Sequence, residues 1–268
     1  MSEDVVLVER DGAVGVMTLN RPEYLNAMNA DVLDRMHVVA REFAEDDAVR
    51  CVVITGAGRA FSAGGDVRSM AARRPGPEGE RENLVGRSDR LREQEEISRL
   101  LYEMPKPTIS AINGVAAGAG VSVSLAADIR IASEQARFIT AFAKVGFSGD
   151  FGGTWLLQRL VGPGRAKELY LLGDAVNAQQ ALALGMVTKV VPHEALMSET
   201  MALARQLAAG PTVAFARMKD NFVFGAASTF GDALTREAEN MTLTGKTADH
   251  KEAALAFLEK REPQFAGR

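Results

Sequence analysis

The stretch TISAINGVAAGAGVSVSLAADI, Thr108 to Ile129, carries the pattern that decides the fold. It opens on a strand-like run, TISAIN, and continues into a turn that contains Gly114, Gly118 and Gly120. A similar unit stands earlier in the chain, where the short apolar run CVVIT (51–55) leads into GAGRAFSAGGDV. Strands that alternate with helices in this way indicate an α/β fold, with parallel strands joined by helical crossovers.

The elements around these two units follow from local patterns. VVLVER (5–10) and VGVMTL (14–19) flank Asp11-Gly12, which predicts a hairpin. Asn29 is expected to cap a helix from Ala30 to Glu45, and its apolar residues fall on one stripe: Val32, Leu33, Met36, Val39, Ala40 and Phe43. Later segments predict a mobile loop at 71–83, a charged helix at 87–103, further helices after Trp155, and a last short strand in MVTKVV (186–191).

Composition sets the class of protein. The chain of 268 residues is 47% hydrophobic and 25% charged, which is ordinary for one large folded domain, with or without a smaller appendage. Its net charge of −4 gives no reason to expect a nucleic-acid or anionic-membrane partner. Cys51 is the single cysteine and reads as a buried apolar residue. With no disulfide and no signal-like N-terminal stretch, we expect a cytoplasmic protein.

The two glycine-rich turns are the first candidate for a functional site. Gly64 and Gly65 follow the first strand unit, and Gly114, Gly118 and Gly120 follow the second. Glycine lets a backbone turn sharply and lets a ligand approach peptide N–H groups. Two such turns at neighbouring strand ends could direct two N–H donors at one oxygen, as in an oxyanion hole, or they could simply be tight packing turns.

Other motifs are incomplete. Val123 occupies the third glycine position of a dinucleotide-binding fingerprint. The segment AFSAG around Ser62 lacks the first glycine of a nucleophile elbow, so Ser62 is a poor candidate nucleophile. His37, His193 and His250 are scattered, so with one cysteine we expect neither a metal site nor a Ser-His triad.

Asp150 is the second candidate. It stands in KVGFSGDFGGTW (144–155), between Phe147 and Phe151. A carboxylate in apolar company loses hydration, which raises its pKa unless it is paired. Asp150 is therefore either a cap of the helix that begins near Gly152 or an acid held in a dry pocket for proton transfer, and the two roles are compatible.

Four motifs, in order, resemble the enoyl-CoA hydratase/isomerase family, the crotonases: LNRPEYLNAMN, AFSAGGDV, INGVAAGAGVSVSLAADIRIAS and FGGTWLLQRLVG. The resemblance runs from Val5 to Pro192. It implies a spiral of ββα turns (1–200) that binds an acyl-CoA, and a C-terminal helical oligomerisation region (201–268). It also implies a homotrimer or a dimer of trimers, with coenzyme A as part of the substrate and no separate cofactor.

The resemblance also implies roles for particular residues. The backbone N–H groups of Gly65 and Ala119 would stabilise a thioester enolate. Three groups of residues would bind the substrate. The first glycine turn would contribute Ala63, Asp66, Val67 and Arg68, and the acyl site would be lined by Ser122 and Phe142. Lys260, in LEKREPQF, would bind the CoA phosphates. A helix-end lysine exposed to solvent is the alternative for Lys260.

The chain departs from the family's hydratases at two positions. Those enzymes use two glutamates, and Ser122 and Phe142 stand at the matching positions here. Hydration needs one group for the water and another for the α-proton, so the loss of both predicts little hydratase activity.

Asp150 instead matches the single aspartate of isomerases similar to those of ring-epoxidised phenylacetyl-CoA. We therefore expect double-bond isomerisation with Asp150 as acid/base, in a site kept dry by Phe142, Phe147 and Phe151. A hydratase and a non-catalytic acyl-CoA-binding member are the alternatives. Dehalogenation or condensation of an aryl-CoA also stays open, since related enzymes place an aspartate here.

Overall fold

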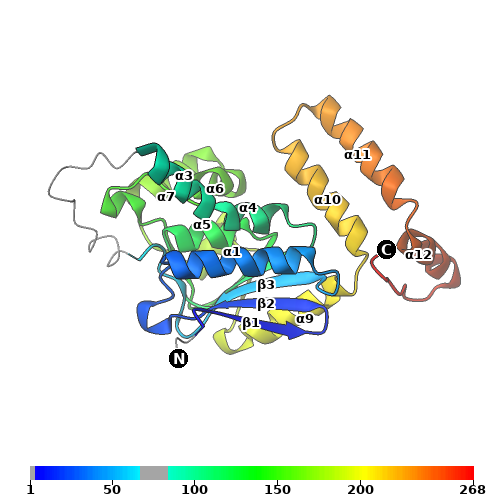
Figure 1. The fold of residues 1–268 in the computed structure, drawn as a ribbon, viewed down its shortest axis with the longest axis horizontal. Helices are drawn as coiled ribbons and strands as arrows, with labels where there is room; N and C mark the ends of the chain where they lie inside the picture. Colours follow the sequence, from blue (N-terminus) through cyan, green and yellow to red (C-terminus); the bar gives the residue numbers. More distant parts are fainter. Residues whose placement is uncertain (1–3, 67–83) are drawn as a thin grey trace.

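The computed structural model describes residues 4–66 and 84–268. Its main sheet has six strands in the order β1-β2-β3-β5-β7-β10 (Figure 1). β1 and β2 pair antiparallel and every other neighbouring pair in this sheet is parallel, which confirms the predicted α/β class. The strands are β1 (Val6–Asp11), β2 (Val14–Leu19), β3 (Cys51–Gly56), β5 (Thr108–Ile112), β7 (Ile129–Ser133) and β10 (Lys189–Val191).

Side chains on both faces of this sheet are buried. Along β3, Val52 and Ile54 join one apolar cluster, while Cys51 and Val53 join a second cluster on the opposite face. This alternation follows from the two-residue period of a strand, and burial on both faces is typical of parallel sheets. Cys51 is fully buried as predicted, and burial raises the pKa of its thiol to about 12.

A second, four-stranded sheet in the order β4-β6-β8-β9 was not predicted. Its strands have two or three residues each, so they are too short to show a period of two in the sequence. They are β4 (Ala60–Ser62), β6 (Val115–Ala117), β8 (Arg137–Ile139) and β9 (Val176–Asn177). β4 follows β3 and β6 follows β5, so this small sheet carries the two glycine-rich turns.

The predicted helix α1 (Ala30–Glu45) has the expected ends. The side-chain oxygen of Asn29 accepts the N–H of Val32 at 3.1 Å, and all six residues of the predicted apolar stripe are buried. The charged helix expected at 87–103 is instead two helices, α3 (Leu84–Gln94) and α4 (Glu96–Glu103). The helical hydrogen bonding changes at the break from the α-helical to the 3-10 pattern, because the Ser98 N–H donates to the Glu95 carbonyl three residues earlier.

Helices after the small sheet frame the centre of the molecule. α5 (Ala119–Ala126) is buried along its whole length and packs against α6 (Gly153–Val161). α7 (Pro163–Leu172) and α8 (Ala178–Leu184) end on Gly173 and Gly185 in the left-handed conformation, as predicted for helix ends. In the part of the chain that the structure describes, no helix has the length and apolar character needed to cross a membrane.

The C-terminal helices divide into two groups (Figure 1). α9 (Leu196–Ala208) packs on β3, β5 and β7, opposite α1. α10 (Thr212–Gly225) and α11 (Phe230–Thr244) form a helical pair that extends away from the sheet, and α12 (Ala248–Glu259) lies beyond them. The predicted boundary at residue 200 falls inside α9 and stays a prediction.

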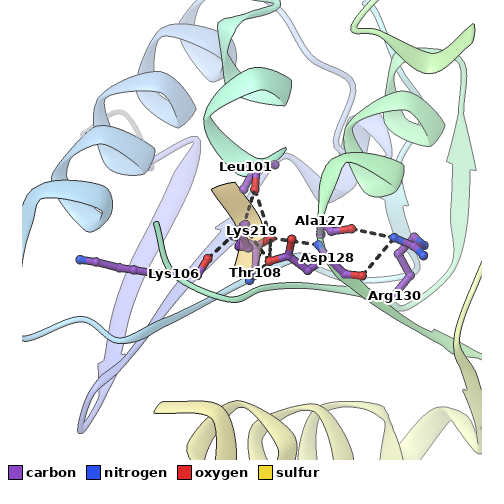
Figure 2. A network of polar contacts seen from close by, with 7 residues as sticks. All are labelled: Leu101, Lys106, Thr108, Ala127, Asp128, Arg130 and Lys219. Atoms are coloured by element: carbon purple, nitrogen blue, oxygen red, sulfur yellow. Dashed lines mark hydrogen bonds and ion pairs between the residues drawn. The ribbon is translucent and has the colours of Figure 1, made fainter. Parts of the chain in front are cut away.

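A buried polar network joins α10 to the core (Figure 2). The Lys219 ammonium donates to a carboxylate oxygen of Asp128 at 2.7 Å and to the carbonyl of Lys106 at 3.0 Å. The same Asp128 oxygen accepts the backbone N–H and the hydroxyl of Thr108, at 2.8 and 3.0 Å. The Lys219 side chain is 11% exposed, and burial lowers its pKa against the opposing charge of Asp128. The network therefore fixes the middle of α10 to the core.

Replacing Lys219 by Met should lower the free energy of unfolding by about 1–3 kcal/mol, because Asp128 would lose its cation in a partly dry site. Urea unfolding at one protein concentration measures this. Lys246→Met is the control, since Lys246 is exposed and its substitution should change stability by less than about 0.5 kcal/mol. Equal losses in the two variants would contradict a structural role for the network.

Candidate active site

The two glycine-rich turns meet, as the sequence predicted for neighbouring strand ends. A Cβ atom at Gly64 would lie 2.5 Å from the Ala117 carbonyl oxygen and 3.2 Å from the Ala119 nitrogen. Gly64 also has φ of +85°, a conformation that side-chain-bearing residues rarely adopt. Glycine is therefore required here, and it brings the backbone after β4 against the backbone after β6.

The segment LNRPEYLNAMN supports the first turn. The Asn26 amide donates to the carbonyls of Ala57 and Ala60, at 2.9 and 2.8 Å. Met28 donates its N–H to the Gly64 carbonyl at 2.7 Å and accepts the Asp66 N–H at 3.1 Å. In such a parallel bridge the residue between, Gly65, directs its own N–H away from Met28.

The second turn places Ala119 at the first position of α5, after Gly118. N–H groups in the first turn of a helix have no acceptor within the helix, and the helix dipole adds partial positive charge there. Ala119 and Gly65 thus lie on adjoining turns. The arrangement can place two backbone donors beside one oxygen.

Asp150 lies in a tight turn before α6, between residues with left-handed backbone: Gly149 (φ 114°), Phe151 (φ 52°) and Gly152 (φ 72°). Its Oδ1 atom is buried and makes no hydrogen bond with the described residues. Burial raises the pKa of the Asp150 carboxyl to about 6, and the negative charge of Glu95 adds to the shift. This is the environment expected of an acid that exchanges a proton near neutral pH.

The structure does not support the alternative role of Asp150 as a cap of the following helix. Gly152 is the N-cap of α6, and no side chain caps it. Asp150 contributes only its backbone carbonyl, which accepts the Gly153 N–H at 3.1 Å. Its carboxyl group is therefore not occupied by a structural role at the helix start.

The apolar surroundings differ in part from the prediction. Phe142 and Phe151 are buried, at 6% and 4% exposure, but Phe147 is 58% exposed and does not shield the site in this chain. The Phe142 ring stacks on Tyr170, with centroids 5.7 Å apart and planes 6° apart. Tyr170 of α7 thus adds a ring beside Phe142 that the sequence did not predict.

Contacts run without a break from the Ala119 turn to Asp150. A Cβ at Gly118 would lie 3.8 Å from the Phe142 ring, and one at Gly149 would lie 3.0 Å from the Tyr170 ring. Burial raises the pKa of the Tyr170 hydroxyl to about 12, and the charge of Asp150 acts in the same direction. The proposed oxyanion turn and the proposed acid therefore share one wall.

Ser122 lies where α5 meets α6. Its hydroxyl is fully buried and forms no hydrogen bond with the described residues. It lies near the Tyr170 hydroxyl, where it opposes part of the rise in the Tyr170 pKa that burial causes. A Cβ at Gly153 would overlap both the Ser122 and the Tyr170 hydroxyl oxygens. Glycine at 153 therefore allows α6, and with it Asp150, to approach α5.

The other predicted substrate-binding residues are placed differently. The Asp66 carboxylate is 3.2 Å from the Arg21 guanidinium, so part of its role is structural. The Ala63 N–H donates to the Leu25 carbonyl at 2.8 Å, and Ala63 is partly exposed beside Gly64. Val67 and Arg68 lie outside the described residues, as does the loop expected at 71–83. Lys260 is the exposed C-cap of α12, apart from α5 and α6 within this chain (Figure 1).

Two residues of the site were not found from the sequence. Tyr170 stands in GRAKELYLLG and Glu95 in a run of charged residues, and neither has a distinctive local pattern. Their proximity to Asp150 depends on long-range packing: the Glu95 carboxylate accepts the Phe151 N–H at 3.0 Å across 56 positions of the chain. A pattern of near neighbours in sequence cannot report such a contact.

A separate cavity of about 430 Å³ lies between α4, α5, α6 and α10, and none of the predicted site residues lines it. Its wall is mostly apolar and includes Tyr102, Trp155 and Phe222. Within residues 4–66 and 84–268, no group of three or more His, Cys, Asp or Glu side chains is arranged to hold a metal ion.

Replacing Asp150 by Asn should stabilise the fold at neutral pH. Because the folded pKa (about 6) exceeds the ordinary value of 3.8, ionisation destabilises the folded state as pH rises through 6. We expect a gain in unfolding free energy of about 1–3 kcal/mol at pH 8 that vanishes near pH 4, allowing for partial exposure. Urea unfolding at several pH values measures it, with exposed Asp174→Asn as a control that should show no such trend.

Comparisons with known proteins agree with this architecture. Residues 9–268 match the family model described as enoyl-CoA hydratase/isomerase. The chain is 39% identical over 265 residues to 1,2-epoxyphenylacetyl-CoA isomerase of Escherichia coli, with 99% of each chain covered. It is 37% identical over 258 residues to short-chain-enoyl-CoA hydratase of Clostridium acetobutylicum, covering 96% of this chain and 95% of the relative.

Solved structures of the family have the same fold. The crystal structure of enoyl-CoA hydratase from Bacillus anthracis superposes with a TM-score of 0.90 at 30% identity, covering 98% of this chain and all of that one. The crotonase-type spiral with C-terminal helices, expected from the sequence, is therefore confirmed. With a family model that spans nearly the whole chain and relatives that match it end to end, this protein belongs to the enoyl-CoA hydratase/isomerase family.

Proposed function

We propose that this protein isomerises a double bond in the acyl group of an acyl-CoA thioester, with Asp150 as the acid/base. One observation carries the proposal: the Asp150 carboxyl has a buried oxygen that no described residue binds, and its pKa is raised to about 6 by burial and by Glu95. A carboxyl with such a pKa can accept and return a proton near neutral pH. A relative 39% identical is named an isomerase.

The proposed reaction has two proton transfers. The Asp150 carboxylate removes a proton from one carbon of the acyl chain, and negative charge moves to the thioester oxygen. The Gly65 and Ala119 N–H groups would stabilise that oxygen, since preorganised donors act most strongly where charge develops. Protonated Asp150 then returns the proton to another carbon, which restores a neutral thioester with the double bond moved.

Hydration is the alternative, because a relative 37% identical is named a hydratase. It would require a second group to activate water. Ser122 and Phe142 occupy the positions where the family's hydratases carry glutamates, and neither side chain is a base. The missing carboxylates favour isomerisation. A non-catalytic acyl-CoA-binding member is the third candidate, and the wild-type assay distinguishes it.

Asp150→Asn should reduce kcat/KM for isomerisation by about a hundred- to ten-thousandfold, because the amide cannot take up a proton. Affinity for the CoA thioester should stay within about twofold, because the substitution preserves shape. A screen of straight-chain and aryl enoyl-CoA substrates, following double-bond position and water uptake together, measures the reaction. Asp174→Asn, an exposed aspartate beyond α7, is the matched control.

Three outcomes would contradict the proposal. Unchanged isomerisation by Asp150→Asn would remove the acid/base role. Water uptake by the wild type without double-bond migration would favour hydration. If the wild type bound CoA thioesters and turned over no enoyl-CoA in the screen, the binding function would be favoured.

We further propose that the protein assembles as a homotrimer or a dimer of trimers through its C-terminal helices. Large apolar side chains on these helices are exposed in the single chain: Phe222 (78%) on α10, Phe230 (81%) on α11 and Phe257 (83%) on α12. Large apolar side chains exposed in this number on neighbouring helices are typical of a surface covered by another chain. The proposed contact of Lys260 with the CoA phosphates would lie in this region.

The wild type should therefore have a solution mass that is a multiple of three chains in size-exclusion chromatography with light scattering. The double variant Phe222→Asp, Phe257→Asp should have a lower mass, because charges at a desolvated interface oppose association. Val38→Asp on α1, where Val38 is 45% exposed, is the control and should keep the wild-type mass. A monomeric wild type would contradict the assembly.

A further inference from the structure

We propose that Glu95 is a positioning residue for Asp150, which anchors the turn that carries Asp150 and places a second negative charge beside its carboxyl group. This inference rests on the proposed function, because it assigns Glu95 a part in the same proton transfer. Glu95 lies between α3 and α4, more than fifty residues before the turn, and the resemblance to the family assigned it no role.

The anchor is a single side-chain contact. The Glu95 Oε1 atom accepts the backbone N–H of Phe151 at 3.0 Å. Phe151 follows Asp150 directly, so this hydrogen bond fixes the peptide next to the proposed acid. A charged acceptor makes a stronger hydrogen bond than a neutral one, which suits the fixing of a backbone segment.

The turn needs such support because its backbone is strained. Phe151 has φ of +52°, a conformation that is rare for a residue with a bulky side chain. Such conformations persist when the surroundings over-determine them. Here the Phe151 ring is buried in the core on one side, and the Glu95 carboxylate binds its N–H on the other.

Among the described residues, no cation forms an ion pair with Glu95. The arginines nearest to it in the sequence, Arg92 of α3 and Arg99 of α4, both pair with Glu96 instead. Glu95 lies between the end of α3 and the start of α4, and the dipoles of these two helices act on its charge in opposite directions.

The other ionisable groups near the Asp150 turn are identifiable element by element. Tyr170 of α7 contacts Gly149 and is a neutral phenol near pH 7, since its pKa is raised to about 12. Lys144, which precedes the turn, lies against Gly173 at the end of α7. Arg159 of α6 lies over the Trp155 ring, 3.5 Å from its centroid. Within residues 4–66 and 84–268, Glu95 is therefore the charged group that acts on Asp150.

The sign of the effect follows directly. A nearby negative charge disfavours ionisation of a carboxyl group, so Glu95 keeps the Asp150 pKa higher than burial alone would. Removing that charge should lower the Asp150 pKa. If Asp150 is the base in the free enzyme, the acidic limb of the kcat/KM profile should then move to lower pH.

Two variants separate anchoring from charge. Glu95→Gln keeps a carbonyl oxygen that can accept the Phe151 N–H and removes the charge, so the acidic limb should move down by about one pH unit. Glu95→Ala removes both, and kcat should also fall about ten- to a hundredfold with KM nearly unchanged, because Asp150 is displaced. Glu93→Gln, on the exposed side of α3, is the control.

Each variant is assayed for isomerisation across pH 4 to 9, and carbon-13 NMR of labelled aspartate follows the Asp150 carboxyl directly. A downward shift in Glu95→Gln, absent in Glu93→Gln, supports the inference. A Glu95→Gln profile and NMR titration that superimpose on the wild type, while Asp150→Asn is inactive, overturn it and leave the proposed function intact. If Asp150→Asn stays active, the proposed function fails, and the NMR titration alone decides whether Glu95 acts on Asp150.

Discussion

The close approach of two backbone turns is the constraint on which the rest of the site depends. Gly64 brings the chain after β4 against Ala117 and Ala119, at distances that leave no room for a side chain. The proposed oxyanion donors are main-chain N–H groups, whose direction is set by strand pairing and by the start of α5. The Asn26 side chain supports the first of these turns by donating to the Ala57 and Ala60 carbonyls. In the small second sheet β4 pairs with β6, which brings the two turns side by side, and β4 also contacts β3 and β5 of the larger sheet.

A second glycine extends the same principle to the acid. Gly153 lets the start of α6 pack on Ser122 of α5, and the turn before α6 then places Asp150 within the same buried region. The Asp150 carboxyl is desolvated by burial and feels the negative charge of Glu95, and no cation is paired with it among the described residues. A charged group in such a site lowers the stability of the folded protein, and proteins commonly tolerate that loss where function requires it.

The C-terminal region has different physical requirements. α9 covers one face of the main sheet, so it contributes to the core, whereas α10 to α12 expose large aromatic residues. Lys219, in the middle of α10, fixes this helix to the core by reaching carbonyls and Asp128. The helical pair is therefore connected to the core through α10 and leaves apolar side chains exposed for association, which is consistent with an assembly built from these helices.

The sequence by itself determined the parts that depend on local rules. The α/β class, the first hairpin, the Asn29 cap, the apolar stripe of α1 and the two glycine-rich turns all follow from patterns within a few residues, and the structure has them. Tertiary structure decided the rest. The break at Glu95, the exposure of Phe147, the burial of the Asp150 carboxyl and the stacking of Tyr170 on Phe142 depend on contacts between segments far apart in the chain. Desolvation and charge at a site come from everything packed around it, so an environment such as that of Asp150 cannot be read from its neighbours in sequence.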